Sequence, residues 1–207
     1  MRLPSLAPPR YDVAMKIRPL TLFAGATLLL GSSCSNAPTT SPTPATAATT
    51  TATAATAPAL SAELQATKVG NLAMPMAGVL TAGQPTEEQM AQLAKLGVTK
   101  VVCLRPASEP GTGWEEGKAA ALGVQFVRLP ITGADDLTPA AAEKLAAELA
   151  AANGQTTLVC CGSSNRVGAL LALKAFHVDK LSKEQALALG KAAGLTKMLP
   201  AVEAKLK

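Results

Sequence analysis

The side chains with the clearest chemistry in this 207-residue chain lie in one short segment. An apolar run, LVCC at residues 158–161, leads into small polar residues at 162–165 and then into Arg166. A cysteine thiolate is a nucleophile that a nearby arginine and helix N-terminal N–H groups stabilise. The guanidinium fork matches the oxygens of a phosphoryl group. We therefore predict a nucleophilic cysteine, Cys161, beside Arg166. The predicted anion-binding residues are Gly162, Ser163, Ser164, Asn165 and Arg166.

Two alternatives stay open for this segment. Five residues separate Cys160 from Arg166, whereas four separate Cys161 from it, so the spacing admits either cysteine as the nucleophile. A cysteine at the end of a strand can also be a buried structural thiol, because free cysteine packs as a small hydrophobe.

The surrounding sequence alternates strand and helix signals. Apolar and β-branched runs predict strands at residues 79–82, 98–104, 124–129 and 156–161. Capping and helix-stop signals predict helices that begin near Thr86, Trp114, Thr138, Arg166 and Ser182. This alternation predicts an α/β fold with a mainly parallel sheet flanked by helices. The cysteine then lies at the carboxyl end of a strand, where such folds bind ligands, and the following helix N-terminus favours an anion.

Hydrolysis of a phosphate ester also benefits from a general acid that protonates the leaving oxygen. Asp135 and Asp136 follow the strand that Pro130 ends, and both are candidates for this role. The alternative is a solvated turn in which Asp136 lies near the helix cap at Thr138.

Other reactive side chains are expected to be structural. Arg105 ends a strand next to the predicted site and is expected to form a structural ion pair, with contact to an anion as the alternative. Cys103 is expected in the core, and His177 is expected to pack at a helix end. No spacing of cysteine and histidine indicates a zinc site, and we predict neither a metal nor a cofactor.

Residues 1–34 are predicted to be a signal segment, with Met15 as the true start. Two basic residues follow Met15, an apolar run spans 20–30, and small residues lead to Cys34. The apolar run is shorter than the roughly 20 residues that a membrane-spanning helix needs. The placement of Cys34 resembles a bacterial lipoprotein signal, which implies lipidation of that cysteine. The alternative is ordinary cleavage nearby with an incidental cysteine.

Residues 35–65 are rich in Ala, Thr and Pro and are predicted to be a low-complexity linker, because they offer little apolar surface to bury. The folded domain is then predicted to span 66–207. Together with a lipidated Cys34, this organisation predicts an exported protein on the periplasmic or cell-surface side, anchored to a bacterial membrane by its lipid.

The composition excludes one class of partner. The net charge is +5, but residues 66–207 carry 15 basic and 12 acidic residues with no basic stripe and few aromatic side chains. Nucleic-acid binding is therefore not predicted.

Several segments resemble a known family. Gly83-Gln84-Pro85, Leu104-Arg105-Pro106, the cysteine loop and residues 186–195 are similar to the beta-lactamase-hydrolase-like phosphatases, which are bacterial relatives of dual-specificity and tyrosine phosphatases. The resemblance covers about residues 78–199. It implies a cysteine-phosphatase fold and a phosphocysteine intermediate, and it favours Cys161 as the nucleophile and Arg166 as the phosphate-binding arginine.

Three residues depart from the family pattern. Cys160 replaces the usual histidine before the nucleophile, and Val167 lacks the hydroxyl that tyrosine phosphatases use in their second step. Ser164 replaces a loop glycine, so we expect a strained backbone if that position needs a positive φ.

The sequence therefore predicts an exported phosphatase that acts on a phosphomonoester, on either a small molecule or a protein. The alternatives are a rhodanese-like sulfurtransferase, which also places a cysteine in a loop with an arginine, and a non-catalytic anion-binding or partner-binding lipoprotein domain. Because exported thiols meet oxidants, we also expect Cys160 or Cys103 to resolve an oxidised Cys161.

Overall fold

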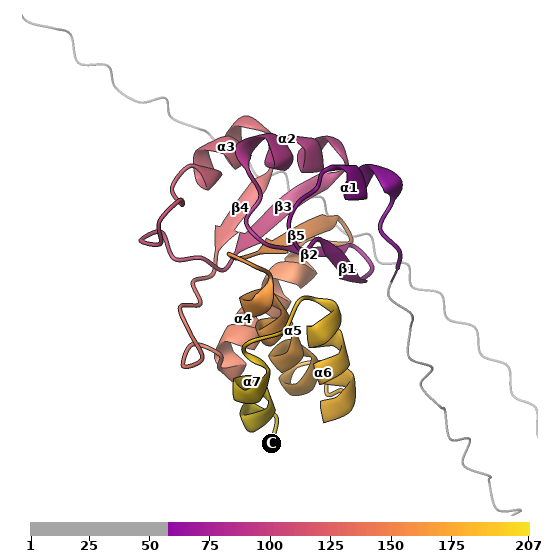
Figure 1. The fold of residues 1–207 in the computed structure, drawn as a ribbon, viewed down its shortest axis with the longest axis vertical. Helices are drawn as coiled ribbons and strands as arrows, with labels where there is room; N and C mark the ends of the chain where they lie inside the picture. The colour runs from indigo at the N-terminus through magenta and orange to yellow at the C-terminus, as the bar shows by residue number, and fades with distance from the viewer. Residues whose placement is uncertain (1–57) are drawn as a thin grey trace, which may run out of the picture. The chain divides into compact units, whose positions relative to one another are not determined.

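A five-stranded sheet lies at the centre of the folded part, which the computed structural model describes for residues 58–207. The strands are β1 (Ala73–Met76), β2 (Val79–Ala82), β3 (Val98–Cys103), β4 (Gln125–Arg128) and β5 (Thr156–Cys160). Their order in the sheet is β1-β2-β5-β3-β4 (Figure 1). The β1–β2 pair is antiparallel and the other neighbours are parallel, so the predicted mainly parallel α/β sheet is confirmed.

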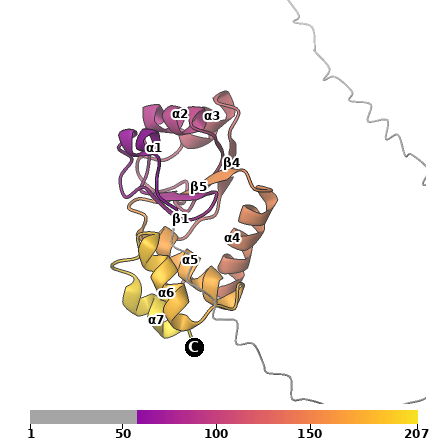
Figure 2. The same ribbon diagram turned by 90° about the vertical axis from the view of Figure 1, so that its right-hand side faces the viewer.

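Helices cover both faces of the sheet (Figures 1 and 2). On one face lie α1 (Ala62–Ala66), α2 (Glu87–Lys95) and α3 (Glu115–Ala121). On the other lie α4 (Pro139–Ala151), α5 (Asn165–His177), α6 (Lys183–Ala192) and α7 (Leu199–Lys205). A buried apolar layer fills the space between the sheet and each set of helices.

The central strands β3 and β5 contribute to both layers, because successive side chains of a strand point to opposite faces. The layer under α1–α3 contains Val101, Cys103, Leu158 and Cys160. The layer under α4–α7 contains Val102, Val159 and Cys161. The two adjacent cysteines therefore belong to opposite sides of the sheet.

Three of the five predicted helix starts, at Thr86, Thr138 and Ser182, are confirmed by their caps. Thr86 and Ser182 each form a capping box with the glutamine three residues later. The Thr138 hydroxyl accepts a hydrogen bond from the Ala141 N–H, 3.2 Å away, at the start of α4. These bonds satisfy helix N–H groups that have no partner within the helix, and so they fix where each helix begins.

Three elements were not predicted. Strand β1 contains Pro75, which sequence patterns count against a strand but which an edge strand tolerates. Helix α7 follows the predicted stop at Gly194. Helix α1 falls within the stretch assigned to the linker, and its Leu64 is buried against the core, so the folded part extends upstream of the predicted boundary at residue 66.

The signal segment 1–34, the lipidation site Cys34 and the linker up to residue 57 lie outside the described residues. Within residues 58–207, no helix combines the length and apolarity needed to cross a bilayer.

Helices α5 and α6 approach closely at two glycines. A Cβ added to Gly168 would lie 2.3 Å from the Leu195 nitrogen and 2.5 Å from the Gly190 oxygen. Both neighbours are backbone atoms, which cannot rotate away as a side-chain end can. This contact matters for the site because Gly168 lies in the first turns of α5, directly after the cysteine loop.

We therefore expect Gly168→Ala to lower the free energy of unfolding by about 1–3 kcal/mol, as overpacking does in well-packed cores. The matched control is Gly117→Ala in α3, where an added Cβ meets no atom within 4 Å. That control should stabilise the protein by about 0.5–1 kcal/mol, because alanine restricts the unfolded chain and favours a helix. Urea unfolding followed by circular dichroism measures both changes, and equal effects would contradict the close packing.

Candidate active site

The predicted loop lies where the sequence placed it, at the carboxyl end of β5 and before α5. The 161–166 loop begins directly after Cys160, the last residue of β5, and helix α5 begins at Asn165. No side chain caps the N-terminus of α5. Its first N–H groups therefore face the loop without an internal partner, an arrangement that favours a bound anion.

The structure brings Cys161 and Arg166 together across this loop. Cys161 is 1% exposed. Hydrogen bonding to Glu109 raises the pKa of Arg166 above its usual value, although burial opposes this shift. The neighbouring Cys161, which lies within hydrogen-bonding reach, raises the pKa of Arg166 further. The loop thus holds a thiol beside a guanidinium.

Cys160 does not share this position. It belongs to the core layer on the other face of the sheet, where its thiol lies within hydrogen-bonding reach of Cys103. The expectation that Cys103 is a core residue is confirmed. The geometry next to Arg166 therefore favours Cys161 over Cys160.

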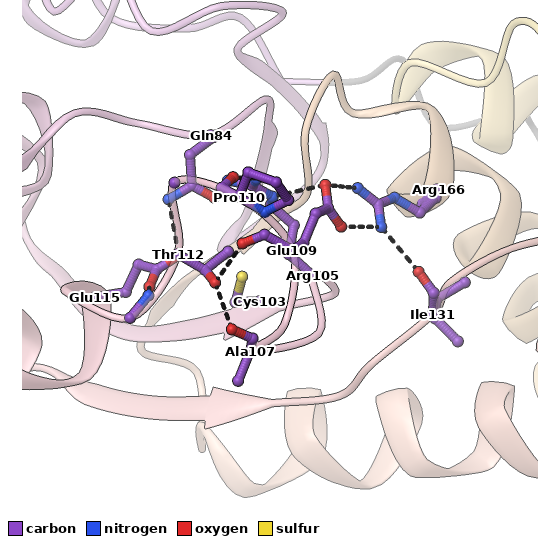
Figure 3. Close-up of polar contacts among 12 residues, drawn as sticks. Gln84, Cys103, Arg105, Ala107, Glu109, Pro110, Thr112, Glu115, Ile131 and Arg166 are labelled. Atoms are coloured by element: carbon purple, nitrogen blue, oxygen red, sulfur yellow. Dashed lines mark hydrogen bonds and ion pairs between the residues drawn. The ribbon is translucent and has the colours of Figure 1, made fainter.

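A carboxylate that the sequence analysis did not single out holds Arg166 in place (Figure 3). Glu109 accepts two hydrogen bonds from the guanidinium, from Nη1 at 2.8 Å and from Nη2 at 2.9 Å. Nη1 also donates to the Ile131 carbonyl, 2.9 Å away. These bonds use the Nη1–Nη2 edge of the fork, so the Nε–Nη2 edge is the one left to face an anion.

The same carboxylate binds a second arginine. Arg105 Nε lies 2.9 Å from Glu109 Oε1, and its Nη2 donates to the Pro110 carbonyl. The predicted structural ion pair of Arg105 is thereby confirmed. The hydrogen bond from Arg166, followed by that from Arg105, lowers the pKa of Glu109 to about 2 although burial opposes the shift.

The Gly-Gln-Pro segment supports the loop from the β2 side. Gly83 is bridged to Ser163, and a Cβ on Gly83 would lie 3.1 Å from the Gly162 oxygen. The Ala82 carbonyl accepts from the Cys161 N–H at 3.3 Å. The side chain of Asn71 donates to the Ser163 carbonyl at 3.2 Å. A glycine at position 83 thus lets the two segments lie close together.

The segment after α6 supports the loop from the other side. The side-chain amide oxygen of Asn165 (Oδ1) accepts from the Thr196 N–H at 2.8 Å and from the Met198 N–H at 3.3 Å. Ser164 has a φ of 64°, so the expected positive φ at the replaced glycine is confirmed. Its buried hydroxyl donates to the Ala193 carbonyl at 2.8 Å, a bond that glycine could not make and that offsets the strain.

The two candidate acids differ in their surroundings. Asp136 Oδ2 accepts hydrogen bonds from the Thr132 hydroxyl, from the Thr132 N–H at 2.6 Å and from the Gly133 N–H at 3.4 Å. The Thr132 hydroxyl and then the backbone N–H groups lower the pKa of Asp136. These bonds favour the ionised form, so Asp136 is a poor proton donor. Asp135 is exposed in the same turn, directly after the segment whose Ile131 carbonyl contacts Arg166.

The remaining predicted residues have structural positions. His177 is the last residue of α5, as expected, and its ring packs edge-on against Phe176. Val167 is fully buried in the layer under α4–α7. Among residues 58–207, no cluster of three His, Cys, Asp or Glu side chains could hold a metal ion.

A surface hollow lies beside the loop rather than on it. Its volume is about 410 Å³, and it is lined by Gln84, Pro85, Thr86, Glu87, Glu88 and Trp114. Gln84 directly follows Gly83, the residue that packs on Gly162, and donates to the buried Glu115 at 3.3 Å. The hollow therefore adjoins the site without including any residue of the 161–166 loop.

Sequence patterns could not have identified Glu109. It lies in the irregular segment between β3 and α3, and no periodicity or motif marks it. One available signal was charge: a buried arginine needs an anionic partner, and Glu109 is the first acidic residue after Arg105.

The site thus places a thiol, a guanidinium and uncapped helix N–H groups at the carboxyl end of the middle strand, an arrangement that suits a phosphoryl group. Comparison with protein families matches residues 70–193 to the family described as Swiss Army Knife protein, DSP-PTPase phosphatase domain. The chain belongs to this family, and its enzyme class is that of a phosphoric monoester hydrolase.

Solved structures share the fold. A DUF442 protein from Shewanella putrefaciens CN-32 superposes with a TM-score of 0.53 at 20% identity, covering 70% of this chain and 94% of that one. TpbA of P. aeruginosa, solved with phosphotyrosine, gives a TM-score of 0.55 at 21% identity and covers 73% of this chain and 88% of its own. A Neisseria meningitidis Z2491 protein superposes with a TM-score of 0.55 at 18% identity, covering 66% of this chain and 96% of that one. No curated protein matches the chain.

The Glu109 ion pair predicts a pH dependence of stability. The folded-state pKa of Glu109 is about 2, below the ordinary value of 4.5. Its ionised form therefore stabilises the fold fully above pH 4.5, and that contribution is lost as the pH falls from 4.5 towards 2. We expect the free energy of unfolding to fall more between pH 6 and pH 3 in the wild type than in Glu109→Gln.

Urea unfolding at the two pH values measures this difference. The matched control is Glu143→Gln, which removes an exposed carboxylate on α4. It should preserve the wild-type pH dependence, and identical behaviour of the two variants would contradict a stabilising role for the Glu109–Arg166 pair.

Proposed function

We propose that this protein is an exported cysteine-dependent phosphatase that hydrolyses a phosphomonoester through a phosphocysteine intermediate. The observation that carries the proposal is the position of Cys161 beside Arg166 at the uncapped N-terminus of α5. A phosphoryl group placed there meets a nucleophile, a guanidinium edge and free N–H groups at once.

In the first step the Cys161 thiolate attacks phosphorus, an S–P bond forms, and the P–O bond to the leaving group breaks. Arg166 has its Nη1–Nη2 edge fixed by Glu109, so its Nε–Nη2 edge binds two phosphoryl oxygens. The N–H groups at the start of α5 bind the remaining charge. Because these donors are fixed before the substrate arrives, little reorganisation is needed as charge develops.

The leaving oxygen requires a proton, and we assign its delivery to Asp135. Asp136 is held ionised by Thr132 and Gly133 and instead shapes the turn. In the second step water attacks phosphorus, Asp135 accepts a proton from it, and phosphate and the Cys161 thiolate are released. Since Val167 offers no hydroxyl to assist, we expect this second step to be the slower one.

Within its family we place the chain among the beta-lactamase-hydrolase-like phosphatases. The Gly83-Gln84-Pro85 segment, the Leu104-Arg105-Pro106 segment and the cysteine loop support this placement. Phosphotyrosine, which TpbA binds in its crystal structure, is the first natural phosphoester to test after a generic aryl phosphate.

We further propose that the protein is exported through its signal segment and attached to a bacterial membrane through a lipid on Cys34. The support is the layout of the first 34 residues: a basic start after Met15, a short apolar run and small residues before the cysteine. A linker rich in Ala, Thr and Pro would then hold the phosphatase domain away from the membrane surface.

The catalytic proposal predicts distinct results for three variants. Cys161→Ser should abolish hydrolysis of p-nitrophenyl phosphate, because it removes the nucleophile. Arg166→Lys should lower kcat/KM on the order of 100-fold, since an ammonium cannot form the paired hydrogen bonds. Cys160→Ser is the matched control and should retain substantial activity. Phosphate release by the full chain measures all three.

Three other results would contradict the proposal. An inactive Cys160→Ser with an active Cys161→Ser would show that the nucleophile is the neighbouring cysteine. Thiocyanate formation from thiosulfate and cyanide without phosphate release would instead identify a sulfurtransferase. Retained phosphate binding with neither activity would identify an anion-binding domain.

The export proposal predicts a mature chain that begins at Cys34 and carries lipid. Mass spectrometry of the membrane-extracted protein should show an N-terminal peptide with the mass of a diacylglycerol-modified cysteine. Cys34→Ala should release the protein from the membrane fraction. An unmodified N-terminus elsewhere in the chain would refute the lipid anchor without affecting the catalytic proposal.

A further inference from the structure

A pair of thiols lies behind the site, on the opposite face of the sheet from Cys161. Cys103 ends β3 and Cys160 ends β5, and the two are register partners in neighbouring parallel strands. The Leu104 N–H donates to the Cys160 carbonyl at 2.8 Å, which holds the two strand ends together. Neighbouring strands lie about 4.8 Å apart, within the roughly 4.4–6.8 Å between Cα atoms that a disulfide needs.

The two thiols have different electrostatic surroundings. Hydrogen bonding from Cys160 lowers the pKa of Cys103, and the charge of Arg128, whose Nη1 lies 3.9 Å from Cys103 Sγ, lowers it further. Burial and the nearby Glu115 oppose this shift. The pKa of Cys160 is raised by its hydrogen bond to Cys103, by burial and by Cys161 and Glu115. Cys103 is therefore the thiol with more thiolate character, and thiolates react fastest with peroxides.

We propose that Cys103 and Cys160 are a modification site, a dithiol that a small hydroperoxide converts into a disulfide. The Cys103 thiolate attacks the peroxide oxygen, an S–O bond forms and the O–O bond breaks. The hydroxide or alkoxide that leaves takes up the proton that the Cys103 thiol released, so a sulfenic acid and a water or alcohol result. The Cys160 thiol then attacks the sulfenic sulfur, an S–S bond forms, and water leaves. Two thiols are oxidised by two electrons, and the peroxide is reduced by two.

Because both thiols are buried, the size of an oxidant decides whether it can reach them. Cys103 and Cys160 are 0% and 1% exposed. Arg128, whose Nη1 lies 3.9 Å from Cys103 Sγ, is 13% exposed and is held by Glu115 and Glu116, so the surroundings of this sulfur leave room for a small oxidant only. A disulfide as large as oxidised glutathione cannot approach a sulfur in this position. The site should therefore respond to hydrogen peroxide and not to glutathione disulfide.

This assignment revises the expectation that Cys103 or Cys160 resolves an oxidised Cys161. Cys161 belongs to the core layer under α4–α7, whereas Cys103 and Cys160 belong to the layer under α1–α3. The backbone of the sheet lies between these layers. The disulfide therefore forms without using the thiol beside Arg166.

Peptide mapping of the full chain tests the proposal. Hydrogen peroxide treatment, alkylation of free thiols and tryptic digestion should give a linked species joining residues 101–118, which contain Cys103, to residues 145–166, which contain Cys160 and Cys161. Cys161→Ser should give the same link in the same yield, and Cys160→Ser should lose it. A link that survives in Cys160→Ser and disappears in Cys161→Ser, or no link in the wild type, would overturn the proposal.

A second measurement tests the role of Arg128. Arg128→Met should slow formation of the link without changing its final yield, because it removes the charge that favours the Cys103 thiolate. Circular dichroism verifies that the variant is folded, and an unchanged rate in a folded variant would refute this part of the proposal. The readout is a peptide mass, so it is independent of whether the protein hydrolyses phosphate esters.

Discussion

The forked ion pair between Glu109 and Arg166 is the interaction on which the geometry of the site depends. The guanidinium is held at three points, by two carboxylate oxygens and by the Ile131 carbonyl. Glu109 follows β3, Ile131 follows β4 and Arg166 follows β5, so one side chain joins the segments after three parallel strands. Without that pairing the partly buried Arg166 would carry an uncompensated charge, which is costly away from water. The pair therefore stabilises the fold and also sets which edge of the arginine faces the loop.

The loop itself depends on close backbone contacts that only certain residues permit. Gly83 lies against Gly162, and a Cβ on Gly194 would lie 2.7 Å from the Cβ of Ser164. Ser164 adopts a left-handed conformation that glycine would adopt without strain. Its hydroxyl compensates by binding the Ala193 carbonyl, which connects the loop to the end of α6. Serine in place of glycine therefore makes the left-handed backbone at residue 164 less favourable, but it adds a tertiary hydrogen bond that glycine could not form.

Much of the fold was predictable because periodicity and capping are local signals. The buried runs at β3 and β5 and the capping boxes at Thr86 and Ser182 mark their elements within a few residues. Strand β1 was missed because its pattern is short and contains Pro75, and its stability comes from pairing with β2. In the site, Cys161 and Arg166 were recognisable from spacing and context. The role of Glu109 depends on a tertiary hydrogen bond to Arg166, 57 residues away, that no local pattern indicates. The difference between Asp135 and Asp136 depends on which carboxylate accepts the Thr132 N–H within one irregular turn, a detail that the sequence pattern does not specify.

Successive side chains of β5 point to opposite faces of the sheet, and this alternation decides which departures from the family pattern affect the site. Cys160 replaces a histidine, but its side chain lies on the α1–α3 face against Cys103, so this change leaves the donors around Cys161 in place. Val167 replaces a residue with a hydroxyl, and its side chain is buried under α4–α7. That change removes a hydrogen-bonding group from the start of α5, where the mechanism that we propose has water attack the phosphocysteine. The first departure therefore bears on the proposed disulfide behind the sheet, and the second bears on the rate of the proposed hydrolysis step.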